Sequence, residues 1–262
     1  VGREAGGEFG ALSGATLSLP AGEVVFGNAG RLAGPGTVVL EGANLKGAFR
    51  VKGGTTFRHV SGDLYGPTDT RSAFIEPGAK WLVQSTSFKG ISGNVANQGT
   101  AIIEGKLSWL HLGVLTNSGL IYLEGSPALD LWGGSDPRLL VNDTLGIIRK
   151  QGAPGSIATI GVPLDNDGKL QAYAGTVELR GGTGASREAI GEYNGFKAGA
   201  VIALMNGSHN LGTGSRITGP APVQVGGDGV VAGPWTVKAG GQILQVDGEV
   251  VGSSSGTPAL IE

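Results

Sequence analysis

Three aspartates in the middle of the chain have the side-chain type needed for acid–base hydrolysis. They are Asp143, Asp165 and Asp167. Glycosidases cleave sugar bonds with two carboxylates, one as general acid and the other as base or nucleophile. Asp165 and Asp167 flank Asn166 in Asp-Asn-Asp-Gly, however, and this is also the composition of an ordinary turn. The turn interpretation is favoured, so we expect no catalytic residue here.

The remaining candidates for chemistry indicate no metal or cofactor. His59, His111 and His209 are far apart in the sequence, and no two have the spacing of a metal-binding pair. Residues 165–168 begin like a calcium loop but lack the further oxygen ligands and the closing glutamate. The chain has no cysteine, which excludes disulfides, thiolate metal sites and a cysteine nucleophile. We therefore expect no cofactor and a non-catalytic protein rather than an enzyme.

Aromatic side chains are the best candidates for binding a ligand, because a flat ring can stack on the apolar face of a sugar. Trp132 ranks first because it lies in a Gly- and Pro-rich insertion, residues 126–138. Trp109 is a further candidate, and so is Tyr65, which lies in a polar segment, residues 61–72, that we expect to be a loop. Tryptophan is mostly buried in folded proteins, so packing remains the alternative for each ring.

The elements that must position these residues are short strands separated by turns. Glycine accounts for 51 of 262 residues, hydrophobic residues for 40% and charged residues for 15%. This composition favours a folded chain with frequent tight turns over disorder. No stretch has the spacing of an amphipathic helix free of Gly and Pro. Short apolar runs such as residues 37–40, 100–104 and 120–124 are typical of strands.

An asparagine-led turn recurs along the chain and predicts the architecture. Four of the five turns read Asn-x-Gly, and the fourth in order reads Asn-Asp-Thr. The last four begin at positions 97, 117, 142 and 166, at nearly even spacing. A period of about 20–25 residues built from strands and turns is typical of a β-solenoid. We expect the asparagines to occupy corners, in the left-handed conformation, and to stack as ladders. They are Asn28, Asn97, Asn117, Asn142 and Asn166.

The repeat runs through the middle of the chain, so we predict one solenoid domain over residues 1–250. Residues 251–262 are rich in Ser and Gly and read as a linker-like tail. The formal net charge of −2, with scattered Lys and Arg, gives no basis for nucleic-acid binding. The longest apolar runs span only a few residues, such as 201–205, so no membrane insertion is expected.

The Asn-x-Gly coil resembles the repeats of large secreted and surface-anchored bacterial proteins, adhesin-like or autotransporter-passenger-like. The segments Gly-Thr-Val-x-Leu-x-Gly at residues 36–42 and 175–181 carry this resemblance together with the turns over 95–182. It implies an all-β, single-stranded, right-handed parallel β-helix in an extracellular or cell-surface location. The implied role is a stalk, adhesion or ligand-presenting module beside other domains of the same chain, with a glycan or another protein as partner. A polysaccharide-binding or polysaccharide-degrading β-helix is the alternative.

Overall fold

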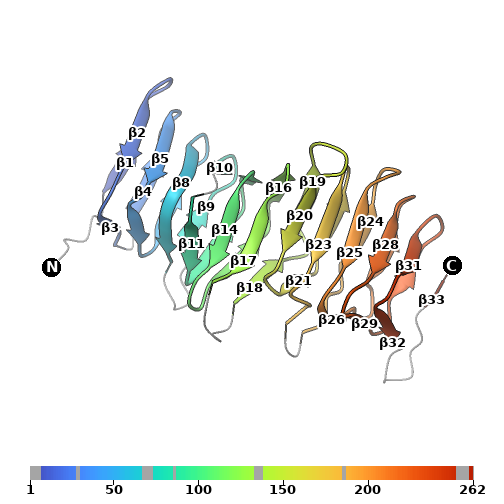
Figure 1. Ribbon diagram of the computed structural model, residues 1–262. Helices are drawn as coiled ribbons and strands as arrows, with labels where there is room; N and C mark the ends of the chain where they lie inside the picture. Colours follow the sequence, from blue (N-terminus) through green and yellow to red (C-terminus); the bar gives the residue numbers. More distant parts are fainter. Residues whose placement is uncertain are drawn as a thin grey trace. The chain divides into compact units, whose positions relative to one another are not determined.

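The protein folds as an all-β parallel β-solenoid with about ten turns of about 22 residues each (Figure 1). The structure is a computed structural model and describes residues 7–27, 30–66, 73–84, 87–132, 138–184, 187–251 and 260–261. These residues contain strands and no helix, and hence no helix long and apolar enough to cross a membrane. The predicted all-β solenoid and the predicted length of its turns are confirmed.

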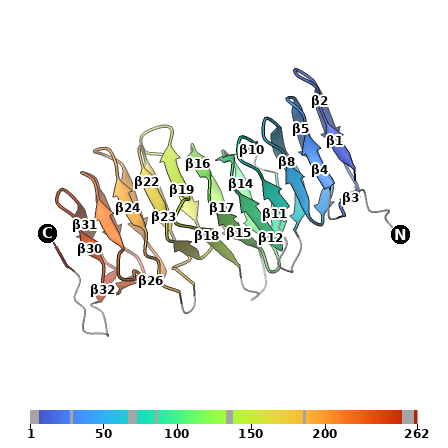
Figure 2. The same ribbon diagram turned by 180° about the vertical axis from the view of Figure 1, so that it is seen from behind.

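The chain divides into two compact units built from the same repeat. Unit 1 comprises Val1–Ile121 and Leu129–Arg138, and unit 2 comprises Tyr122–Ala128 and Leu139–Glu262. In each unit the second and third strands of successive turns form two parallel sheets, called here its second and third sheets. The first strands form one parallel sheet in unit 1, called its first sheet, and two separate groups in unit 2. Within each unit, strands of successive turns lie side by side (Figures 1 and 2).

Unit 1 contains the earlier turns, and β16 and β17 include residues of both units. The first sheet contains β1 (Glu8–Gly10), β4 (Gly30–Ala33), β7 (Phe49–Val51), β9 (Ala73–Ile75), β12 (Asn94–Asn97) and β15 (Val114–Asn117). The second contains β2 (Thr16–Leu19), β5 (Thr37–Glu41), β8 (Thr56–Tyr65), β10 (Lys80–Val83), β13 (Thr100–Ile103) and β16 (Leu120–Glu124). The third contains β3 (Glu23–Val25), β6 (Asn44–Lys46), part of β8, β11 (Lys89–Ser92), β14 (Lys106–Trp109) and β17 (Ala128–Leu131).

Unit 2 repeats the arrangement. Its first strands are β18 (Leu139–Asn142) and β21 (Leu164–Asn166), followed by a separate sheet of β26 (Gly207–Asn210), β29 (Gly229–Ala232) and β32 (Glu249–Val251). Its second sheet contains β19 (Ile147–Gln151), β22 (Lys169–Ala172), β24 (Glu192–Gly195), β27 (Arg216–Thr218), β30 (Thr236–Val237) and β33 (Leu260–Ile261). Its third sheet contains β20 (Ile157–Ile160), β23 (Thr176–Leu179), β25 (Val201–Leu204), β28 (Pro222–Val225) and β31 (Gln242–Gln245).

Alternation of side chains along each strand builds the core. In β13, Ala101 and Ile103 are fully buried, whereas Thr100 and Ile102, which alternate with them, are partly exposed. A single turn cannot cover its own inward face, so the next turn must stack on it in register. Val38, Phe57 and Trp81 are such register partners in three successive turns, and all three are fully buried. The apolar columns that result supply the hydrophobic stabilisation of the solenoid.

Strand β8 shows where the predicted loop over residues 61–72 was wrong. The strand continues through Tyr65, because its first half pairs with β5 and β10 and its second half pairs with β6 and β11. Gly62 makes the bend between the halves with φ of 91°, and a Cβ there would lie 2.1 Å from the Ala43 carbonyl oxygen. Residues 67–72 lie outside the described residues.

The predicted tail over residues 251–262 also needs correction at both described ends. Val251 is the last residue of β32, and Leu260 and Ile261 form β33. Strand β33 pairs with β30, with Leu260 opposite Thr236 and Ile261 opposite Val237. Backbone pairing therefore adds these two residues to the second sheet of unit 2.

Candidate functional site

The corner asparagines form buried side-chain ladders within each unit. In unit 1, Asn97 and Asn117 are register partners, and the Asn97 Nδ2 donates to the Asn117 Oδ1 at 2.7 Å. In unit 2, Asn142 and Asn166 pair in the same way, also at 2.7 Å. All four are fully buried, so these amides serve the scaffold and are not available to a ligand.

Asn28 lies outside the described residues, and the column that contains Asn97 holds apolar side chains in the earlier turns. Counting backwards from Asn97, the register partners are Ile75, Val51 and Leu32. Apolar side chains therefore occupy the same column in the earlier turns. The spacing of the turn motif could not reveal this, because Asn28 precedes its strand while Asn97 ends one.

The expectation of a left-handed conformation is wrong for the four described asparagines, Asn97, Asn117, Asn142 and Asn166. Among the described residues, Leu112 is the only non-glycine with positive φ. The asparagines are instead the last residues of extended strands. The glycine of the motif is needed because the turns approach closely: a Cβ on Gly119 would lie 2.3 Å from the Gly99 carbonyl oxygen.

The three candidate catalytic aspartates are engaged by the scaffold. Asp143 Oδ1 accepts the Leu145 backbone N–H at 3.0 Å, and Asp167 Oδ1 accepts that of Ile190 at 3.2 Å. Asp165 Oδ2 accepts a charge-assisted bond from Arg187 Nη1 at 2.5 Å. Burial raises the pKa of Asp165, and the bond from Arg187 counteracts part of this rise.

Two of the three histidines are packed into the solenoid. His59 is fully buried beside Phe57 and Trp81, with ring centroids 6.1 and 6.4 Å away, and its Nε2 donates to the Gly62 carbonyl oxygen at 2.7 Å. His209 Nε2 bonds the Asn206 carbonyl oxygen at 3.0 Å. Burial lowers the pKa of each imidazole to about 4. No group of three His, Asp or Glu side chains that could hold a metal occurs in the described part of the chain.

Two strand lysines that the sequence did not single out are fully buried, Lys89 in β11 of unit 1 and Lys150 in β19 of unit 2. Lys89 Nζ donates to the Ser87 carbonyl oxygen at 2.7 Å, and burial lowers the pKa of its amine to about 8. Lys150 Nζ donates to the Gln151 carbonyl oxygen at 2.6 Å and to Ser156 Oγ at 2.8 Å. Both amines bond to their corners, so these groups serve the structure.

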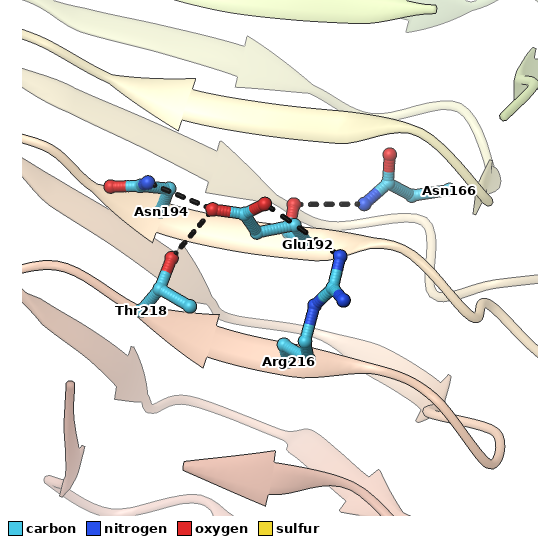
Figure 3. A network of polar contacts seen from close by, with 5 residues as sticks. All are labelled: Asn166, Glu192, Asn194, Arg216 and Thr218. Atoms are coloured by element: carbon cyan, nitrogen blue, oxygen red, sulfur yellow. Dashed lines mark hydrogen bonds and ion pairs between the residues drawn. The ribbon is translucent and has the colours of Figure 1, made fainter. Parts of the chain in front are cut away.

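In unit 2, Glu192 organises a polar network across three turns, in which the Asn166 Nδ2 donates to the Glu192 backbone carbonyl oxygen at 3.4 Å (Figure 3). Asn194 Nδ2 and Thr218 Oγ1 donate to its Oε1 at 2.9 and 2.8 Å, and Arg216 lies 3.9 Å from its Oε2. Burial acts to raise the pKa of Glu192, but these hydrogen bonds and the nearby cations bring it below its usual value. A carboxylate held ionised in this way joins neighbouring turns.

A stack of planar groups runs along the second sheet of unit 2. The Arg149 guanidinium lies 4.6 Å from the centroid of the Tyr173 ring, and the Phe196 ring stacks on Tyr173 at 4.1 Å with 13° between the planes. Arg149 also donates twice to Gln171 Oε1, at 3.0 and 2.9 Å. The faces of Tyr173 are therefore used inside the stack.

The predicted sugar-binding residues differ in exposure, and the prediction for Trp109 was wrong. Trp109 is fully buried, as is Trp81, and Trp235 is 4% exposed. Tyr65 is partly buried, donates to Asp63 Oδ2 at 3.2 Å and lies under Lys46 Nζ at 5.4 Å. Trp132 alone among the four tryptophans is exposed, at 57%.

Trp132 lies at the end of β17 with exposed groups from two other turns of unit 1. Its ring meets Phe88 in an edge contact, with centroids 4.9 Å apart and 66° between the planes. Its backbone N–H donates to the Trp109 carbonyl oxygen at 3.0 Å. Two residues before it, Asp130 Oδ2 pairs with Lys106 Nζ at 3.1 Å. The sequence did not predict that Trp132 lies near Phe88 and the Lys106–Asp130 ion pair, because Phe88 and Lys106 lie in earlier turns.

No protein-family model matches this chain, and the searches of curated proteins and of solved structures found no match either.

Proposed function

We propose that this chain is a non-catalytic module of a larger extracellular or cell-surface protein, where it acts as a stalk that presents a ligand-binding surface. In this proposal the solenoid is a right-handed β-helix of the adhesin-like or autotransporter-passenger-like kind. Its neighbours are further domains of the same chain, and its partner is a glycan or another protein.

The observation that carries the proposal is the use of the candidate catalytic carboxylates as structural groups. Asp143 and Asp167 accept backbone N–H groups at corners, and Asp165 pairs with Arg187. A general acid or base needs its carboxyl group within reach of a substrate. Carboxylates that are already bonded to corners and to a guanidinium are better suited to holding turns together.

Contacts between turns support the role of a stalk. The Glu192 network and the Asn142–Asn166 bond each join residues that belong to different turns. Such contacts add side-chain bonds to the backbone ladder between parallel strands. A repeat held together turn by turn suits a protein that keeps a binding surface in place.

Polysaccharide cleavage is the second candidate function, favoured by one feature of Asp165. Burial raises the pKa of this carboxyl, and a raised pKa is a property of the general acid in glycosidases. Its Oδ2, however, is taken by Arg187. The exposed ring of Trp132 supports ligand binding in either case.

Two measurements test the proposed function. Incubation with a polysaccharide panel should release neither reducing ends nor unsaturated products. Turnover that disappears in Asp165→Asn would contradict the non-catalytic role and favour cleavage. An antibody raised against the domain should label intact source cells, and labelling only after permeabilisation would contradict a surface location.

A further inference from the structure

An exposed aromatic pair on the third sheet of unit 1 has the chemistry of a carbohydrate site. We propose that Trp132 and Phe88, with Lys106 and Asp130, bind a neutral pyranose sugar. This inference rests on the proposed function, because it names the ligand class that the module would present. It concerns only side chains of unit 1.

The aromatic pair leaves ring surface available. Trp132 is 57% exposed and Phe88 is 38% exposed, although they touch each other. An edge contact at 66° covers at most one face of either ring, so a face of Trp132 remains open for stacking. The C–H face of a pyranose is the complement of such a surface.

The backbone of Trp132 is held in position by the preceding turn. Its backbone N–H bonds to the Trp109 carbonyl oxygen, and Trp109 is itself fully buried in the core. Leu129 is fully buried and Asp130 after it is partly exposed, whereas Leu131 and Trp132 are both exposed where β17 ends. The aromatic platform therefore begins two residues after a solvent-accessible carboxylate.

The ion pair beside the rings selects for a neutral ligand. Lys106 and Asp130 are 3.1 Å apart, and their side chains are 40% and 35% exposed. Because each side chain neutralises the other, the ion pair offers no net charge to attract an anionic sugar or a quaternary ammonium. A quaternary ammonium would suit an aromatic pair beside an unpaired carboxylate, but here the carboxylate is paired. Both groups can still bond to hydroxyls, the lysine as a donor and the carboxylate as an acceptor.

Another exposed ring, Phe196, provides the matched control. It is 45% exposed but stacks on Tyr173 in unit 2, and no ion pair between its neighbours is found in the described residues. Its removal deletes a comparable exposed aromatic surface from a different place. Ligand affinity at Trp132 should not change when Phe196 is removed.

Fluorescence quenching reports on this site directly, because Trp81, Trp109 and Trp235 are buried. Iodide should quench mainly Trp132. Cello-, chito- and malto-oligosaccharides at millimolar concentration are the probes, with oligogalacturonate and tetramethylammonium for comparison. We expect at least one neutral oligosaccharide to protect Trp132 from iodide and to bind in titration calorimetry.

Variants then decide where the ligand binds. Trp132→Ala should weaken binding of that oligosaccharide by about tenfold or more, the loss expected for one stacking ring. Phe196→Ala should leave it unchanged, and circular dichroism should show that both variants are folded. The sugar site would be overturned if wild type and Trp132→Ala bound the oligosaccharide equally, or if both variants lost binding equally. It would also be overturned if the protein preferred tetramethylammonium or oligogalacturonate, or bound no neutral probe.

Reducing-end release in the same mixtures separates this inference from the proposed function. Binding without turnover supports both. Binding with turnover overturns the non-catalytic role and leaves the sugar site standing. Surface labelling of source cells without any binding overturns the sugar site and leaves the module's location standing.

Discussion

At the scale of single residues, the Asn ladder explains why an amide recurs at one column of unit 1. Asn117 accepts from the Asn97 amide and donates to the Gly119 carbonyl oxygen at 3.3 Å, and both asparagines are fully buried. Apolar residues fill the same column one and two turns earlier, at Ile75 and Val51. Apolar side chains therefore fit this column, whereas a buried amide without a hydrogen-bond partner there would lower the stability.

Asn117→Leu should lower the free energy of unfolding by about 1–3 kcal/mol, because the buried Asn97 amide loses the nearer of its two acceptors. Urea unfolding followed by circular dichroism measures the change. Thr116→Val on the partly exposed side of the same strand is the control. This control should change stability by less than about 1 kcal/mol. Two apolar side chains leave no unpaired amide in the column. The double variant Asn97→Ile with Asn117→Ile should therefore lose less free energy of unfolding than the sum of the two single variants.

Close approach between turns predicts a different penalty at Gly119. A methyl group added there would lie 2.3 Å from the Gly99 carbonyl oxygen, closer than non-bonded atoms allow. We expect Gly119→Ala to destabilise unit 1 by about 1–3 kcal/mol or more, because the backbones must separate. Gly7→Ala, where no atom lies within 4 Å of the added carbon, serves as the control. Equal thermal midpoints for the two variants would argue against the close contact.

At the scale of an element, the outer surface of the second sheet in unit 2 is held by contacts that only planar groups can make. The Arg149 guanidinium both stacks on Tyr173 and donates twice to Gln171. Lysine keeps the charge but lacks the flat fork that serves both contacts.

Arg149→Lys should therefore destabilise unit 2 by about 1 kcal/mol. Arg180→Lys is the matched control, because Arg180 is half-exposed and pairs with Glu178 on its own turn. An exposed ion pair of that kind contributes little, so this variant should unfold at nearly the wild-type urea midpoint. Indistinguishable midpoints for the two variants would show that the stack adds no stability.

At the scale of the whole molecule, each unit contains one buried histidine that must stay neutral. Burial lowers the pKa of His59 in unit 1 and of His209 in unit 2 from 6.5 to about 4. Between pH 6.5 and 4 the unfolded chain therefore binds more protons than the folded chain. The stabilising effect of the neutral imidazole is complete above pH 6.5 and is lost as the pH falls towards 4.

Each histidine should cost about 3 kcal/mol of stability over that range, from about 1.36 kcal/mol per unit of pKa. Burial raises the pKa of Asp63 and of Asp165, which offsets part of the loss because their folded forms bind protons first. Urea midpoints measured from about pH 7.5 down to about pH 4 should fall, and His209→Leu should flatten the decline for unit 2. A midpoint independent of pH would contradict the buried neutral imidazoles.

The sequence by itself determined the solenoid. The spacing of Asn97, Asn117, Asn142 and Asn166 reports the length of a turn, and short apolar runs such as residues 100–103 report the strands. Both are local signals, because a turn residue and a short strand depend on a few neighbouring positions. Glycine and proline around Trp132 indicated an insertion and made it the first binding candidate, although the sequence left packing open as the alternative.

The tertiary structure alone decided which side chains share a surface. Trp109 and Trp132 are both aromatic residues near a strand end, yet one is fully buried and the other is 57% exposed, since alternation and the next turn place them differently. Phe88 contacts Trp132 from two turns earlier in the chain, and Lys106 joins Asp130 across one turn. Burial of Lys89 and Lys150 likewise depends on how neighbouring turns stack. Stacking brings together residues from separate turns, and no local pattern encodes which of them meet.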